Sequence, residues 1–183
     1  MGEGGFVCFD RFYYKGDDIA SNYHSMALGD VEILDFEKWT MSRLRLKSVD
    51  TEQHIAYTTG PTFLASSISG FFPNHRYLIE NVKEALKKPG EWYLDRCTDP
   101  PGCTNSEGTW TLTYLAKPGE NPNKQPVIVP QIPQLLVVEG LEYVSFKGLT
   151  FSHDNWLPGP EGLGDYQGGP KVPGAAKFGG AGA

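Results

Sequence analysis

Very short apolar segments follow one another closely from residue 125 onward, and this pattern most constrains the fold. The segments occupy residues 126–129, 134–138, 143–146 and 149–151. Gly140 and Gly148 stand at the breaks, where a chain can change direction sharply without a Cβ penalty. Such spacing predicts the first rungs of a parallel β-helix, whose rungs turn corners every few residues and stack on one another. A further antiparallel hairpin is the alternative, and periodicity alone favours it.

The preceding residues, 1–124, predict a mainly β subdomain. Strands are expected at the aromatic residues 12–14 and at residues 31–36. Residues 43–49 and 54–58 predict a hairpin, because charged or polar residues alternate with apolar ones before a polar turn. A second hairpin is expected from residues 91–96 and 109–115. The alternation leaves one face of the sheet exposed to solvent, so these strands suit an antiparallel, sandwich-like arrangement.

One short surface helix is predicted at about residues 78–88. Ile79, Val82 and Leu86 recur there at helical spacing. Pro89 and Gly90 follow and supply a helix stop.

The C-terminal residues, 157–183, are dominated by Gly, Pro and Ala and predict a long loop, because few large apolar residues are available to offset the entropy of ordering. Residues 175–180 resemble the start of a strand that is then cut off. The expected organisation is a β-rich part at 1–124, first rungs at 125–156, and this loop with the start of a truncated rung. The chain is therefore expected to be a piece of a larger protein.

Charge and hydropathy exclude two classes of partner. The formal net charge of -6 argues against a nucleic-acid ligand, because nucleic-acid binders cluster Lys and Arg. No apolar run is long enough to span a membrane, so no membrane partner is expected. Cys97 and Cys103 bracket a Pro- and Gly-containing turn and are equally consistent with a disulfide or with two free thiols.

Three stretches resemble the right-handed parallel β-helix proteins of the pectin-lyase-like class, several of which are glycoside hydrolases. They are residues 80–86, 89–96 and 140–153. The resemblance implies a β-rich insert followed by the opening rungs of a right-handed β-helix. It also implies an oligosaccharide or polysaccharide partner, an extracellular or cell-surface location with the signal sequence outside this chain, and catalytic acids on later rungs beyond Ala183.

The candidate substrate-binding residues are His153, Asp154, Asn155 and Trp156. A Trp face can stack on a sugar ring, while His and Asn side chains can bond its hydroxyls. The plainer alternative is that Trp156 closes the end of the β-helix and His153 is an ordinary rung residue, and the residue pattern favours it.

The remaining candidates are weaker. A glycosidase needs two suitably spaced carboxylates, and the acids able to face a cleft are Asp154, Glu161 and Asp165, which could also bind calcium. Their spacing matches no known calcium loop, so neither a metal nor a cofactor is predicted. The other three tryptophans are expected to pack in the core; they are Trp39, Trp92 and Trp110.

The sequence thus predicts a part of a carbohydrate-active β-helix protein of the glycoside hydrolase type, with the catalytic acids outside this chain. The alternative is a non-catalytic β-helix that binds glycan or serves as a structural module.

Overall fold

A computed structural model describes residues 9–37, 40–62, 70–96, 110–164 and 175–179. The chain forms two compact units, one of residues 1–124 with 158–169 and one of residues 125–157 with 170–183. Strands dominate the regular structure, which confirms the mainly β prediction. The three cysteines, Trp39 and Asp165 lie outside the described residues. Among those described, no helix is long and apolar enough to cross a membrane.

A five-stranded antiparallel sheet organises the first unit. In spatial order its strands are β1 (Phe9–Tyr13), β4 (Ile55–Thr62), β3 (Met41–Asp50), β2 (Glu32–Phe36) and β5 (Arg76–Glu80). These include the predicted strands at 12–14 and 31–36 and the predicted hairpin of 43–49 with 54–58.

The long strand β3 is shared between two neighbours. Its first half, from Met41 to Arg45, pairs with β2, and its second half, from Leu46 to Asp50, pairs with β4. The register shifts between Leu46 and Ser48. A bulge of this kind bends a strand and lets it pass from one sheet to another, which is how orthogonally packed sheets form their corners.

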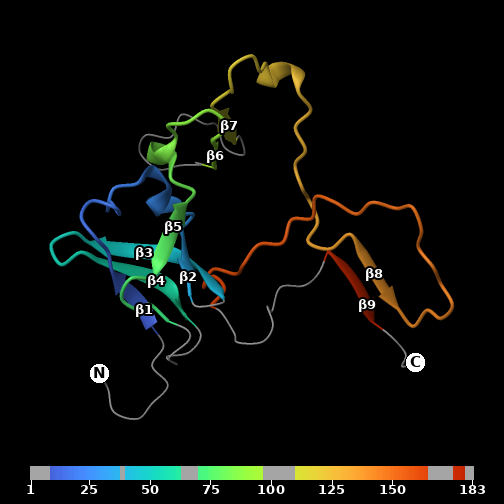
Figure 1. Cartoon of the computed structure of the whole chain (residues 1–183), viewed down its shortest axis with the longest axis horizontal. Helices are drawn as coiled ribbons and strands as arrows, with labels where there is room; N and C mark the ends of the chain where they lie inside the picture. Colours follow the sequence, from blue (N-terminus) through green and yellow to red (C-terminus); the bar gives the residue numbers. More distant parts are fainter. Residues whose placement is uncertain (1–8, 38–39, 63–69, 97–109, 165–174, 180–183) are drawn as a thin grey trace, which may run out of the picture. The chain divides into compact units, whose positions relative to one another are not determined.

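The core lies between the two halves of this bent sheet. Phe12 of β1 packs its ring 4.7 Å from that of Phe71 and 5.2 Å from that of Tyr77, on β5. The outer strands β1 and β5 therefore meet across the core, and β5 crosses the β3–β4 hairpin in Figure 1. Ile33 and Leu46 are almost fully buried between them. Burial of each such side chain contributes about 1.5–3 kcal/mol.

The helix predicted at residues 78–88 is wrong. Residues up to Glu80 belong to β5, and only a short 3-10 turn, η2 (Lys83–Ala85), follows. This segment pairs antiparallel with the open edge of β2. The ladder runs from Glu32 opposite Glu80 to Phe36 opposite Arg76. Asn81 then takes a left-handed φ of 61°, which a continuing right-handed helix excludes. Tertiary pairing has overridden local helical spacing.

The second predicted hairpin is confirmed as β6 (Trp92–Asp95) paired antiparallel with β7 (Thr111–Tyr114). The expected core packing of two tryptophans is wrong, because Trp92 is 63% exposed and Trp110 55% exposed. Tyr93 and Asp95 are the β6 residues that face the interior. Strand alternation places Trp92 on the opposite face, and the sequence did not reveal which face the fold would cover.

Part of the predicted C-terminal loop docks on the first unit. The backbone groups of Arg43 and Leu163 exchange hydrogen bonds of 2.8 and 2.6 Å, on the edge of β3 that β4 has left. The hydroxyl of Thr59 donates to the carbonyl of Pro160 at 2.8 Å. Gly162 makes the approach possible, because a Cβ there would lie 2.6 Å from the carbonyl oxygen of Arg43.

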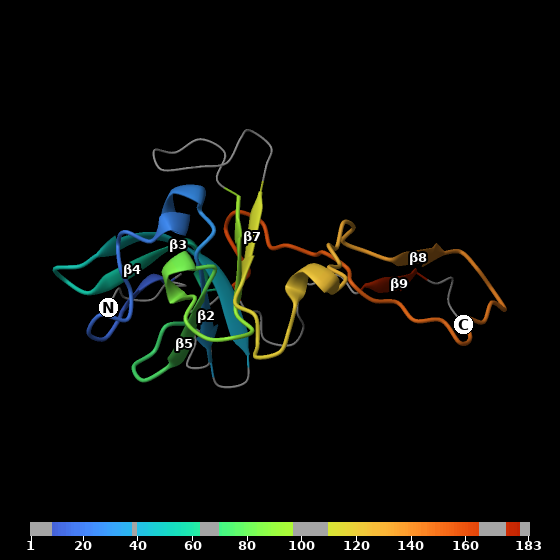
Figure 2. The ribbon, with the colours of Figure 1, turned by 90° about the horizontal axis from the view of Figure 1, so that it is seen from above.

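The second unit contains two short strands, β8 (Leu136–Glu139) and β9 (Ala176–Gly179), which pair in parallel. They run side by side in both views (Figure 1, Figure 2). The strand start predicted at 175–180 is thus present, and β8 matches the predicted segment at 134–138. The predicted segments at 126–129, 143–146 and 149–151 form no strand, because their backbones join no ladder among the described residues. The described residues therefore contain one parallel pair and not a complete β-helix.

Substitution of Gly162 should destabilise the first unit. Gly162→Ala adds a Cβ at a φ of 76° and against the β3 backbone, so we expect a loss of about 2 kcal/mol in the free energy of unfolding, measured with urea. Gly159→Ala is the matched control, because a Cβ at Gly159 meets nothing within 4 Å. Equal effects of the two substitutions would contradict the docking role of Gly162.

Candidate functional site

The predicted binding residues lie in the second unit, on a segment without regular secondary structure. His153 is exposed and takes a left-handed φ of 66°, whereas Asp154, Asn155 and Trp156 are half-buried. The backbone N–H of Asn155 donates to the carbonyl of Ile132 at 2.8 Å, which ties the segment to the chain that precedes β8. The four residues are thus held as one short stretch, and their role in binding stays a prediction.

The other predicted acids do not join them in a described site. Glu161 is an exposed residue of the first unit, where its backbone lies against Gly60. Asp165 is outside the described residues. No group of three or more His, Cys, Asp or Glu side chains within the described ranges is arranged to hold a metal ion.

A buried carboxylate cluster lies at the end of β2, where the residue pattern predicted no site. Asp35 is 1% exposed, and Glu37 is also buried. The hydroxyl of Ser42 donates to Glu37 at 2.8 Å and that of Thr40 donates to it at 3.0 Å. Nδ1 of His75 lies 3.4 Å from Asp35.

Burial raises the pKa of Asp35 to about 6, with the charge of Glu37 acting in the same direction and the contact with His75 opposing both. A raised carboxyl pKa beside a second carboxylate resembles the division of roles in a glycosidase. A sugar cannot reach these oxygens, however, because both side chains are buried. These carboxylates are therefore enclosed within the fold and are not placed to contact a substrate.

His75 connects this cluster to the surface. Its side chain is 18% exposed, and it lines a shallow cavity of about 560 Å³ together with Asp18 and Tyr77. The hydroxyl of Tyr77 donates to Asp18 at 2.8 Å. Burial, followed by this hydrogen bond to a carboxylate, raises the pKa of Tyr77, so the phenol stays protonated and can only share its proton.

Two further ion clusters fix the elements around the sheet. Arg43 bonds both Glu32 of β2 and Glu80 of β5. These two carboxylates stand directly opposite one another in the β2–β5 ladder, where like charges are destabilising without a cation between them. The arginine therefore offsets a repulsion that the strand register imposes.

Asp95 of β6 is the centre of the second ion cluster. It accepts a hydrogen bond of 2.9 Å from Lys83 and lies 3.2 Å from Nε2 of His24. Because His24 belongs to the turn η1 (His24–Leu28) and Lys83 to η2, this carboxylate ties both turns to the inner face of the hairpin.

Only one sequence signal could have indicated these clusters. Glu32 and Asp35 interrupt the otherwise apolar stretch 31–36, and acidic residues on a buried strand must be paired or protonated. Their partners come from residues far away in the chain, so the sequence alone could not identify them.

Comparisons of the chain with protein-family models, curated proteins and solved structures find no match.

Replacement of Asp35 should change how stability depends on pH. The pKa of Asp35 rises from 3.8 in the unfolded chain to about 6 in the fold, so its protonation favours the folded state at low pH and that contribution is lost between about pH 4 and 6. Asp35→Asn should therefore reduce the decline in unfolding free energy from pH 4 to pH 7.5 by about 2–3 kcal/mol.

Urea unfolding at the two pH values measures the difference. Asp17→Asn serves as the control, because Asp17 is an exposed carboxylate of the same unit. An unchanged pH profile for Asp35→Asn would contradict the assignment.

Proposed function

We propose that this chain belongs to a carbohydrate-active protein of the parallel β-helix type, of which the second unit supplies opening rungs. The observation that carries the proposal is the parallel β8–β9 ladder. Leu136 pairs with Ala176 and Glu139 with Gly179, so the chain returns to the same register forty residues later. A hairpin, the alternative for this region, would pair its strands antiparallel.

The path between β8 and β9 supports the same proposal. A parallel connection needs a crossover of a dozen or more residues, which is usually helical. Within the second unit, the described part of the connection is not helical and turns through four left-handed residues instead. They are Gly140, Tyr143, Gly148 and His153, with φ between 57° and 69°. Repeated sharp corners of this kind are what a coil of stacked short strands requires.

Sugar binding is assigned to the corner segment at residues 153–156. Trp156 is half-buried and supplies an amphipathic ring, whereas His153 is exposed and supplies a hydrogen-bonding imidazole. Asp154 and Asn155 lie between them and add an acceptor and an amide. An aromatic ring beside several hydrogen-bonding groups is the composition of a sugar subsite.

The proposal places this activity in a protein of the glycoside hydrolase type, at the cell surface or outside the cell. The described residues are assigned binding rather than bond cleavage, because the carboxylates of Asp35 and Glu37 are buried and Glu161 lies in the other unit. The catalytic acids are accordingly assigned to later rungs.

Loss of the Trp156 ring should weaken polysaccharide binding. We expect Trp156→Ala to raise the Kd for the best ligand of a polysaccharide panel about tenfold, which corresponds to about 1.4 kcal/mol. Affinity electrophoresis ranks the panel, and titration calorimetry on the selected ligand gives the Kd. Trp156→Phe should retain most of the affinity, because it keeps an aromatic face.

Tyr13→Ala is the control, since Tyr13 is 78% exposed on β1 in the first unit. Failure of the unmodified chain to bind any polysaccharide of the panel would overturn the proposal. Release of reducing sugar by this chain would contradict the assignment of the catalytic acids to later rungs.

A further inference from the structure

The β6–β7 hairpin presents an aromatic face that the fold leaves uncovered. Trp92 stands opposite Tyr114 and Leu94 opposite Leu112 in the ladder, so their side chains share one face. Trp110 precedes β7 and continues this alternation. Trp92 is 63% exposed, Trp110 55% and Leu112 49%. We call Trp92, Trp110, Leu112 and Tyr114 the hairpin platform.

The opposite face of the hairpin carries out the structural role. Tyr93 is 4% exposed and Asp95 is 7% exposed. Asp95 is bonded to Lys83 and contacts His24, which anchors this inner face to the rest of the unit. The hairpin is thus fixed through one face while the platform faces outward, and packing within the unit does not explain the exposed tryptophans.

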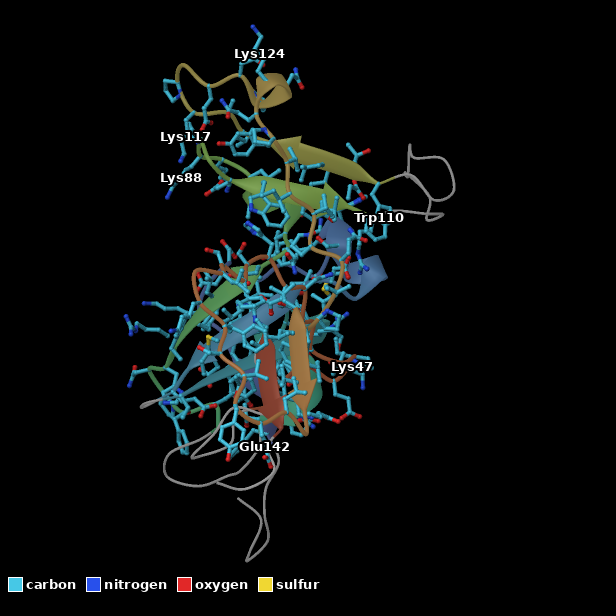
Figure 3. All side chains as sticks on the ribbon, turned by 90° about the vertical axis from the view of Figure 1, so that its right-hand side faces the viewer. Lys47, Lys88, Trp110, Lys117, Lys124 and Glu142 are labelled. Atoms are coloured by element: carbon cyan, nitrogen blue, oxygen red, sulfur yellow. The ribbon has the colours of Figure 1, made fainter. Side chains whose placement is uncertain are left out.

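A cation lies over the ring of Trp110. The guanidinium of Arg96 lies 5.9 Å from the centroid of the indole ring. The same guanidinium donates two hydrogen bonds to the carboxylate of Asp30, one of them from Nε at 3.0 Å. This bidentate pair orients the arginine, which makes a weak cation–π contact with the exposed indole. Trp110 lies at one end of the hairpin and Lys117 toward the other (Figure 3).

The ring of Tyr114 is held in a similar way. Its hydroxyl donates to Glu120 at 2.6 Å, and the same carboxylate accepts the backbone N–H of Lys117 at 2.9 Å. The hydrogen bond to this carboxylate raises the pKa of Tyr114, so the phenol remains a proton donor to Glu120. Aromatic rings that are orientated before a ligand arrives lose less entropy on binding.

We propose that the hairpin platform is a polysaccharide-binding surface, on which pyranose rings stack against Trp92, Tyr114 and Trp110. The ligand class rests on the proposed function, whereas the site is independent of residues 153–156 and lies in the other unit. A pyranose has apolar C–H faces that match an exposed indole and hydroxyl edges that match nearby carboxylates. Glu120 supplies such a carboxylate beside Tyr114.

The dimensions of the platform favour an extended chain over a single sugar. Trp92 and the position opposite Trp110 are four residues apart along the strand direction, which corresponds to about 13 Å. The three rings therefore span more than one pyranose. Stacking of nucleic-acid bases is disfavoured, because the chain has a net charge of -6 and repels a phosphate backbone.

The test compares two surfaces in the full chain. The platform variants are Trp92→Ala and the double variant Trp92→Ala with Trp110→Ala, and Trp156→Ala represents the other site. Tyr13→Ala again controls for loss of an exposed aromatic ring. Binding is measured by sedimentation with insoluble polysaccharide and by calorimetry with soluble oligosaccharides of increasing length, and circular dichroism checks that each variant remains folded.

We expect the double variant to bind the polysaccharide at least tenfold more weakly. Its affinity for oligosaccharides should also no longer increase with their length. Trp92→Ala alone should lose several-fold, and it decides the outcome if the double variant does not fold. Unchanged binding by the platform variants together with lost binding by Trp156→Ala would overturn the platform and support the site at residues 153–156.

The reverse result would support the platform and overturn the assignment of residues 153–156. Absence of any polysaccharide binding by the unmodified chain would overturn both. If the unmodified chain instead self-associates, and the double variant is a monomer with unchanged sugar binding, the platform is a protein interface and the proposal is wrong.

Discussion

The bend in β3 is the constraint on which the first unit depends. This strand pairs with β2 from Met41 to Arg45 and, on its other edge, with β4 from Leu46 to Asp50, and its register shifts between Leu46 and Ser48. The bend brings β1 and β5 together across the core, where Phe12 contacts Tyr77. It also leaves an edge of β3 free at Arg43, which the segment at residues 158–164 fills. The packing of β1 against β5 and the docking of residues 158–164 on the free edge of β3 are thus both linked to this one bulged strand.

Charged groups in this unit follow from the same pairing. Because β5 is drawn onto β2, Glu80 is placed opposite Glu32, and Arg43 offsets their repulsion. Asp35 on the same strand is buried, and its carboxylate lies 3.4 Å from Nδ1 of His75. The carboxylates of Glu32 and Asp35 are buried. They therefore act on the stability of the fold and not in the glycan binding that is proposed for exposed residues.

The two proposed binding surfaces differ in how they are built. The segment at residues 153–156 lies at a corner of the second unit, whereas the hairpin platform is a strand face whose reverse side is anchored by Asp95. Weak stacking contacts gain strength when several rings engage one chain at once, because each later contact forms at high effective concentration. An extended polysaccharide suits such an arrangement better than a small ligand.

The sequence by itself determined the mainly β class, both hairpins and the strand start at residues 175–180, because alternation and turn residues act over a few positions. It did not determine the structure of residues 78–88. Helical spacing predicted a helix there, but residues up to Glu80 pair with the open edge of β2. It also did not determine which face of β6 would be covered, so Trp92 was expected in the core. The partners of Asp35 and Asp95 come from distant parts of the chain. Tertiary structure decided these points, because strand edges, covered faces and ion partners exist only after the chain has folded.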